Sequence, residues 1–269
     1  MPVLHPFDAA IALEPVGAGL VRGRTRPDWA NMVGPFGGIT AATMLRALDM
    51  QPDRLGEPVA LTVNFAAPIT DGDFDIVVES ARTNRTNQHW IAQLRQDGQT
   101  KTTATALFGL RRDTWADTEA HPPVVPTPEQ AGAQEPSDFS PWLRNYDMRT
   151  VVGPAPTRVA QVYSESTTTL WVRDNPPRRL DHPAVAALCD VFYPRVFLRR
   201  GEFVPAGTIS LTTYFHADGG QLEMVGDDFL LGSARANRFG GGYFDQSAAL
   251  WSRAGTLLAM SHQIVYFKG

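Results

Sequence analysis

The sequence predicts an α+β protein made of two tandem copies of one unit, each a helix followed by an antiparallel sheet. The first observation is a repeated motif, because residues 80–85 and 233–238 agree in five of six positions. The second is a match upstream of it, where residues 61–65 align with 211–215 at a similar offset. Two copies of roughly 110 residues are too few and too long for a solenoid. A fused pair often replaces a homodimer, so we expect the functional cleft between the copies.

In the first copy, a glycine-led helix is expected to come before the sheet. Apolar side chains recur at helical spacing over residues 37–48 and follow a pair of glycines. Strand-like runs then predict four strands, at residues 60–66, 74–82, 89–96 and 100–110. Short turn sequences rich in Asp and Gly separate several of them. The first copy is therefore predicted as one helix packed on an antiparallel meander.

The second copy repeats this order. Its helix is expected near residues 183–198, with Pro183 in the first turn, where proline is tolerated. Pro194 lies four residues after Asp190, so a helix through both would lose a hydrogen bond. We expect the helix either to bend there or simply to change course. Four strands should follow, near residues 208–216, 229–237, 242–252 and 257–267.

Between the copies lies a proline-rich stretch with few periodic apolar residues. Residues 113–156 contain eight prolines and are predicted as a connector between unit 1–112 and unit 157–269. Aromatic residues return near residues 139–144, so part of the connector is expected to pack on the body of the protein.

Composition excludes several classes of protein. The chain has 269 residues, of which 43% are hydrophobic and 19% charged, as in an ordinary soluble globular protein. No run approaches the roughly 18 apolar residues of a membrane helix, and no leader-like segment opens the chain, so we expect no membrane insertion and a cytoplasmic location. A net charge of −4 gives no general attraction to nucleic acid. The single cysteine, Cys189, excludes an internal disulfide and a cysteine-based metal cluster.

Candidate catalytic groups are few. Asp190 lies in an apolar run, where an unpaired buried carboxylate would be costly, so it is a functional group, part of an exposed helix face, or half of an ion pair. His216 and His262 stand alone on strands, where histidine is usually structural. The sequence lacks a Gly-x-Ser-x-Gly elbow, a phosphate-binding loop and a dinucleotide fingerprint.

Three parts of the sequence resemble the acyl-CoA thioesterase II (TesB-like) family of double hotdog proteins. The first is Phe36-Gly37-Gly38 before the first helix, the second is residues 186–190 in the second helix, and the third is a pair of strands near residues 207–216 and 258–263. The resemblance implies a double hotdog fold of class α+β and an enzyme of lipid metabolism that hydrolyses acyl-CoA to fatty acid and CoA. It implies that Asp190, Thr208 and Gln263 are catalytic, and that neither a cofactor nor a metal is needed.

The chemistry of a thioester suits these groups. Its thiol leaving group has a pKa of about 8.5, so water activation is the main task. Asp190 would accept a proton from water, while the hydroxyl of Thr208 and the amide of Gln263 fix the water's position. Backbone amides beside Gly37 and Gly38 are a reasonable source of oxyanion stabilisation.

The phosphates of CoA would need arginines. Arg235 and Arg238 in the repeated motif are one candidate pair, and Arg195, Arg199 and Arg200 are another group, although several of these side chains are expected to be merely solvated. The acyl chain would run between the two central helices.

The repeat and the rival functions complete the prediction. The first-copy counterparts of Asp190, Thr208 and Gln263 fall within residues 37–43, at residues 58–59 and at Ala106. The first of these stretches has no carboxylate, and the other two have no polar side chain. The equivalent site in the first copy should therefore be catalytically inactive. A hotdog enoyl-CoA hydratase typically has histidine five residues after the aspartate, where this chain has Arg195, which makes hydration a weaker alternative. A non-catalytic acyl-CoA-binding or sensing module is the other alternative. Exposed sheet edges leave a homo-oligomer open.

Overall fold

The structure is a computed structural model that describes residues 4–133, 140–154 and 161–269. The first copy consists of α1 (Pro6–Ala10), β1 (Glu14–Gly17), β2 (Leu20–Arg24), α2 (Gly37–Asp49), β3 (Glu57–Phe65), β4 (Asp73–Thr83), β5 (Asn87–Gln96) and β6 (Gln99–Gly109). After α3 (Pro128–Ala131), the second consists of β7 (Tyr146–Val152), β8 (Thr168–Asp174), α4 (His182–Leu188), α5 (Arg195–Arg200), β9 (Ala206–Phe215), α6 (Gly219–Val225), β10 (Leu230–Arg235), β11 (Phe239–Gly240), β12 (Tyr243–Ser252) and β13 (Leu257–Phe267).

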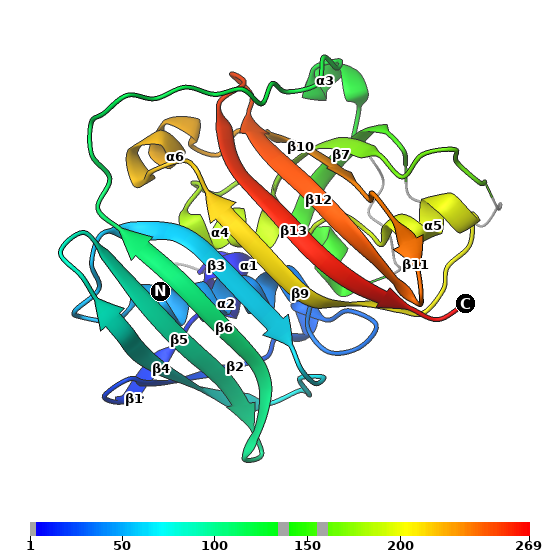
Figure 1. Ribbon diagram of the computed structural model, residues 1–269. Coiled ribbons are helices and arrows are strands. Elements are labelled where there is room, and N and C mark those ends of the chain that lie inside the picture. Colours follow the sequence, from blue (N-terminus) through cyan, green and yellow to red (C-terminus); the bar gives the residue numbers. More distant parts are fainter. Residues whose placement is uncertain (1–3, 134–139, 155–160) are drawn as a thin grey trace.

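All strands join one antiparallel sheet that curves around α2 and α4 (Figure 1). Its order is β1-β2-β4-β5-β6-β3-β9-β13-β12-β10-β8-β7, and β11 pairs with β12. Each strand of the first copy has its counterpart at the mirrored place in this order. The predicted α+β double hotdog arrangement is therefore confirmed.

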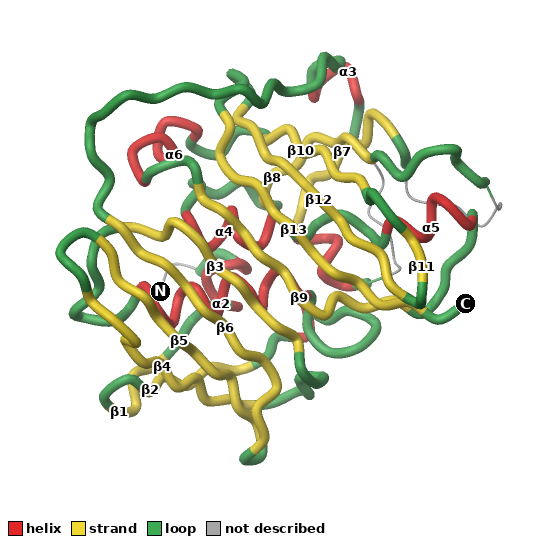
Figure 2. Tube along the Cα trace, viewed as in Figure 1, coloured by secondary structure: helices red, strands yellow, loops and turns green. Residues whose placement is uncertain are grey.

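The two copies meet where β3 lies beside β9, at the centre of the sheet (Figure 2). Thr62 pairs with Thr212, its own counterpart in the repeat, and their hydroxyl oxygens are 2.9 Å apart. The flanking pairs run symmetrically outward from this point. A pseudo-twofold axis therefore passes between these two threonines and relates the two ends of the helix pair.

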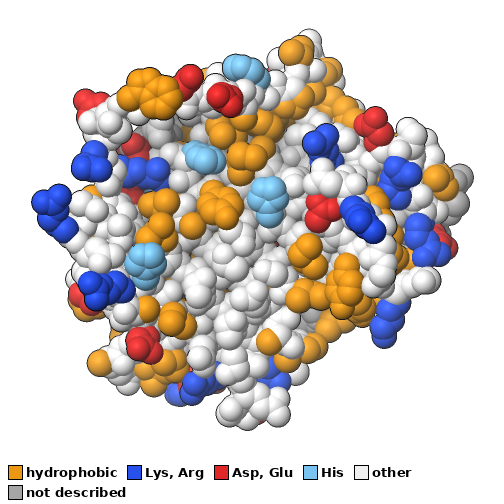
Figure 3. Space-filling view, viewed as in Figure 1, with side chains coloured by type: hydrophobic (Ala, Val, Ile, Leu, Met, Phe, Trp, Pro, Cys, Tyr) orange, Lys and Arg blue, Asp and Glu red, His pale blue; other side chains and the backbone are white. Residues whose placement is uncertain are grey.

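Small side chains allow the two central helices to pack closely. In α2, Ala41, Ala42 and Ala47 are fully buried, and in α4 Ala184 and Ala186 are fully buried as well. Burial on nearly all sides of α2 removes a large apolar area from water, which is the main driving force for folding. On the face of the molecule seen in Figure 3, most Lys, Arg, Asp and Glu side chains lie toward the rim.

The prediction of a single helix over residues 183–198 is wrong. The helix α4 ends at Leu188, and α5 starts at Arg195 directly after Pro194. Proline has no N–H to continue the helical ladder, so the chain changes course instead of bending. Asp190 consequently lies in the link between α4 and α5 and belongs to neither helix.

The stretch predicted as a connector contributes a strand to the second copy's half of the sheet. Strand β7, which falls within residues 113–156, pairs with β8 at the sheet edge. Of that stretch, residues 134–139, 155 and 156 lie outside the described residues, as does part of the aromatic run near residue 139. Within the three described stretches, no helix has the length and hydropathy needed to cross a membrane.

Candidate active site

The carboxyl group of Asp190 faces the N-terminus of α2. A methyl group added at Gly37 would lie 2.6 Å from Asp190 Oδ2, so only glycine leaves room for the carboxylate there. The backbone N–H of Gly38 also faces this carboxyl group and favours its charged form. The structure therefore brings together Asp190 and the glycine pair that the sequence singled out.

Gln263 and Thr208 complete a hydrogen-bonded chain with Asp190. Gln263 Nε2 donates to Asp190 Oδ1 at 2.8 Å, and Thr208 Oγ1 donates to Gln263 Oε1 at 3.1 Å. Gln263 is only 4% exposed, so its amide needs these partners. The pairing of β9 with β13 holds the two side chains together, helped by an irregularity in register between Ile264 and Val265. All three predicted catalytic residues thus form one connected group.

Burial raises the pKa of Asp190 to about 7. The hydrogen bond from Gln263 and the amide of Gly38 act in the opposite direction, but loss of solvation outweighs them. The residue as a whole keeps partial contact with solvent. A carboxyl group with a pKa near neutrality is suited to accept and release protons at physiological pH.

The N-terminus of α2 lacks a side-chain cap of its own. The first N–H groups of a helix have no partner within the helix, and the preceding residue, Phe36, offers no side-chain acceptor. Asp190 supplies an acceptor from the other copy. The remaining amides at this helix end are oriented to bind a further negative charge.

An aromatic wall lies beside this helix end. Phe36 stacks on Trp142 with ring centroids 4.0 Å apart, and Tyr146 meets both rings edge to face. The Tyr146 hydroxyl is buried without a hydrogen-bond partner in the described part of the chain, and burial, followed by the charges of Asp174 and Asp190, raises its pKa. Sequence reasoning missed Trp142 and Tyr146 as neighbours of the site, and the only signal was the return of aromatic residues within a proline-rich stretch.

Arg195 does not take part in this group. It is fully buried, and its guanidinium donates to the Tyr193 carbonyl, the Ser166 carbonyl and the Thr168 hydroxyl. Arg195, five positions after Asp190, therefore has a structural role and holds neighbouring segments together through these hydrogen bonds. Cys189 is buried as well, and burial raises the pKa of its thiol to about 12, so it is no nucleophile.

The other predicted residues lie apart from the trio in the described structure. Arg235 and Arg238 are exposed, at the end of β10 and in the turn after it, and no recorded contact links either to Asp190. Burial lowers the pKa of His216, and its backbone carbonyl accepts a hydrogen bond from Arg111. His262 Nδ1 is 3.1 Å from the Ser247 hydroxyl. Arg235 and Arg238 stay predictions as CoA contacts.

The pseudo-equivalent positions in the first copy can now be read from the sheet register. Pro58 pairs with Phe108 as Thr208 pairs with Val265. Ala106 pairs with Leu61 as Gln263 pairs with Leu211, which gives the predicted counterparts. Counted from the helix starts, the counterpart of Asp190 is Leu45, just beyond residues 37–43. None of these counterparts carries a polar side chain.

Comparison with protein families gives two adjacent matches. The family model for the acyl-CoA thioesterase N-terminal domain matches residues 25–109. The model for the acyl-CoA thioesterase C-terminal domain matches residues 118–267. None of the curated proteins searched matches the chain.

Solved structures agree on the fold. A conserved protein of unknown function with a hot dog fold from Alicyclobacillus acidocaldarius is 48% identical, with 99% of both chains covered and a TM-score of 0.94. A protein from Thermobifida fusca described as a candidate thioesterase II is 21% identical, with 100% of this chain and 99% of that chain covered and a TM-score of 0.86. The tesB protein of Mycobacterium avium subspecies paratuberculosis is 21% identical, with 98% of both chains covered and a TM-score of 0.79.

Proposed function

The chain belongs to the acyl-CoA thioesterase family, and on that premise we propose that it hydrolyses acyl-CoA to a carboxylic acid and free CoA. The observation that carries this proposal is the hydrogen-bonded chain from Thr208 through Gln263 to Asp190, directed at the uncapped end of α2. This arrangement places the carboxylate of Asp190, a proton acceptor, beside the N-terminus of α2, where backbone amides favour negative charge.

In the proposed reaction, Asp190 acts as the general base. Its Oδ1 is held by Gln263, which leaves Oδ2 to take a proton from water as the water oxygen bonds to the thioester carbon. The carbonyl oxygen becomes an oxyanion, which the amides in the first turn of α2 that do not bind Asp190 stabilise. The tetrahedral intermediate then collapses, the carbon–sulfur bond breaks, and Asp190 returns the proton to the departing thiolate of CoA.

Thr208 and Gln263 are proposed as positioning residues. The sequence leads to the expectation that both hold the water directly. The hydrogen bonds from Thr208 to Gln263 and from Gln263 to Asp190 support a role in orienting the carboxyl group instead. For CoA, Arg235 and Arg238 remain the proposed phosphate contacts, since both are exposed arginines.

Gln263→Leu is expected to lower kcat about 10–100-fold, because a hydrogen bond to a charged group is lost. It should also raise the pKa seen in the pH profile, since that bond favours the ionised carboxylate. Gln246→Leu is the matched control: Gln246 is the buried glutamine paired with Gln263 across β12 and β13. Steady-state thiol release measures both variants, and equal losses would contradict the positioning role.

The pH profile of the unaltered protein provides a further prediction. Because only the ionised carboxylate accepts a proton, kcat/KM is expected to rise with pH and level off above a pKa of about 7. On the acid side it should fall about tenfold per pH unit. A rate that stays flat from about pH 5 to pH 7 would exclude Asp190 as the base.

The proposal as a whole is tested by thiol release from short-, medium- and long-chain acyl-CoAs. Turnover on at least one chain length supports the hydrolase. Thermal stabilisation by acyl-CoA without any thiol release would instead support the sensing module. Loss of the conjugated double bond of an enoyl-CoA, without thiol release, would support the hydratase.

A further inference from the structure

A cavity of about 490 Å³ lies at the C-terminal end of α2 and the start of α4, the opposite end of the helix pair from Asp190. The C-terminal turn of α2, the start of α4 and the segment after α1 enclose it. Its volume is within the roughly 300–1,000 Å³ typical of small-molecule sites. It is therefore large enough for a ligand and separate from the catalytic trio.

The pseudo-twofold axis relates this cavity to the Asp190 site. Pro58, the counterpart of Thr208, and Leu45, the counterpart of Asp190, both line it. The duplication has thus kept a pocket at the second position, but apolar side chains replace two members of the trio. A ligand held here would meet no counterpart of the Asp190 carboxylate.

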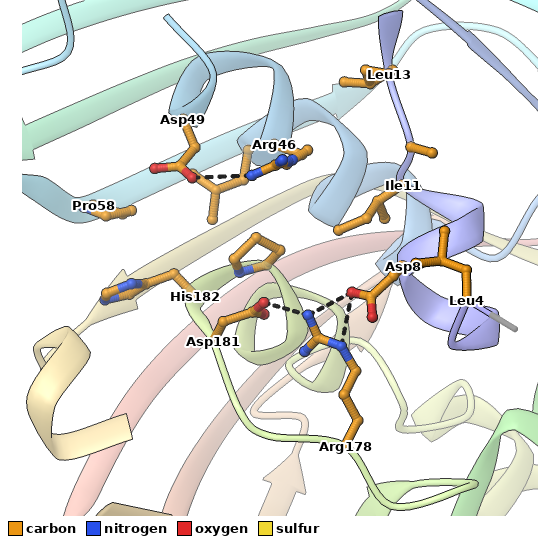
Figure 4. A pocket seen from close by; sticks show the side chains of 13 residues that line it. Leu4, Asp8, Ile11, Leu13, Arg46, Asp49, Pro58, Arg178, Asp181 and His182 are labelled. Carbon is orange, nitrogen blue, oxygen red and sulfur yellow. Dashed lines mark hydrogen bonds and ion pairs between the residues drawn. The ribbon is translucent and has the colours of Figure 1, made fainter. Parts of the chain in front are cut away.

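Side chains of two kinds line the cavity. Five apolar side chains form part of the lining, which we term the apolar wall: Ile11, Leu13, Leu45, Pro58 and Pro183. Charged side chains make up most of the rest, and they are arranged as ion pairs (Figure 4). A lining that combines apolar and charged groups can accommodate an amphipathic molecule.

Arg46 is the cation best placed to change partners. Its one recorded ion pair in the described structure is with Asp49, at 3.5 Å, and its side chain is 43% exposed. Asp49 would not be left alone if Arg46 moved, since Arg54 Nε lies 3.1 Å from it. A guanidinium of this kind can bind a carboxylate through two parallel hydrogen bonds.

The other two carboxylates of the cavity share one guanidinium, so each is paired although their combined charge exceeds that of the arginine. Arg178 binds Asp8 at 2.7 Å and Asp181 at 2.5 Å, so neither carboxylate faces an incoming anion unpaired. Arg178 itself is committed to these two partners and is not available to a ligand. The anion-binding role therefore falls to Arg46.

We propose that this cavity binds a straight-chain carboxylic acid, with the carboxylate on Arg46 and the alkyl chain along the apolar wall. The acid has the chemistry of the product of thioester hydrolysis, but its binding here requires no turnover. The inference is therefore independent of the proposed hydrolase activity, and either can fail without the other.

Calorimetric titration of the full chain with decanoate tests the proposal. We expect saturable binding that weakens at least tenfold in Arg46→Gln, and weaker binding of decanol than of decanoate. Ala12→Trp, at an exposed lining position, is expected to block binding by filling the cavity. Arg22→Gln is the matched control: Arg22 is an exposed arginine in an ion pair with Asp75 on β4.

The two cavity variants make the test decisive even if one of them is poorly folded, and melting curves identify such a variant. Decanoate binding that is unchanged in both Arg46→Gln and Ala12→Trp would place the acid elsewhere and overturn the proposal. Absence of any binding at millimolar decanoate would overturn it as well. An equal loss in Arg22→Gln would show that general charge, and not Arg46, is responsible.

Discussion

Asp190→Asn is expected to lower kcat for thiol release by about 10³-fold, since a general base contributes a factor of this order. The substitution preserves shape but leaves no group that can accept a proton. The oxygen of the asparagine can still accept from Gln263 Nε2, which donates to Asp190 Oδ1 in the unaltered protein, so the amide nitrogen takes the place of Oδ2. Acyl-CoA binding, measured by titration, should change by only a few fold, because the carboxylate itself is not a CoA contact.

Asp174→Asn provides the matched control. Asp174 is 4% exposed, and burial raises its pKa to about 7, the same shifted value as for Asp190. It lies on β8, outside the hydrogen-bonded trio. We expect Asp174→Asn to retain turnover. Comparable loss in both variants would mean that buried charge in general, and not a base at Asp190, controls the rate.

Both substitutions should change stability in the same direction. A carboxyl group whose pKa rises on folding stabilises the folded state only while it is protonated. Its unfolded form ionises near pH 4, so the free energy of unfolding falls as pH rises from about 4 to about 7. Removing either charge is therefore expected to raise the free energy of unfolding at pH 8, by on the order of 3 kcal/mol.

Urea unfolding at about pH 5 and pH 8 measures this effect. The gain should be small at pH 5 and larger at pH 8. For Asp190→Asn, greater stability would accompany lost turnover, as expected where a catalytic group is held in an unfavourable environment. Asp174→Asn should gain stability alone. A destabilised Asp190→Asn at pH 8 would show that its hydrogen bonds outweigh the cost of burying the charge.

The regular part of the fold could be predicted because its signals are local. Alternating side chains predicted each central strand to within a few residues, and the duplicated motif predicted two copies. The second-copy helix was predicted as too long because its apolar pattern continues past Asp190. Pro194 interrupts the helical hydrogen bonding, although the apolar side chains after it are still buried.

The candidate site required contacts between distant parts of the chain. The resemblance to a family pointed to Asp190, Thr208 and Gln263, but the order in which they bond depends on the register of β9 against β13. The partnership of Trp142 with Phe36 joins residues more than one hundred positions apart. No periodicity in the sequence carries such information, because it arises only when the connector folds back on the first copy.

Gly38→Ala is expected to destabilise the protein by about 3 kcal/mol, although alanine is intrinsically the better helix former. An added Cβ would lie 2.6 Å from the backbone oxygen of Ala187 and would overlap the Phe36 ring. Neither can yield easily: the oxygen belongs to α4, and the ring is stacked on Trp142. Chemical unfolding measures the loss.

Gly37→Ala separates this packing effect from chemistry. Its added Cβ would meet Asp190 Oδ2 at 2.6 Å and the Phe65 ring at 3.5 Å, both of them side-chain atoms that can move. We expect a small change in stability but a loss of turnover, since Asp190 is displaced from its place at α2. If both variants lost stability equally, the two glycines would share one packing role. The opposite patterns would show that Gly38 lets the helices approach and that Gly37 makes room for the base.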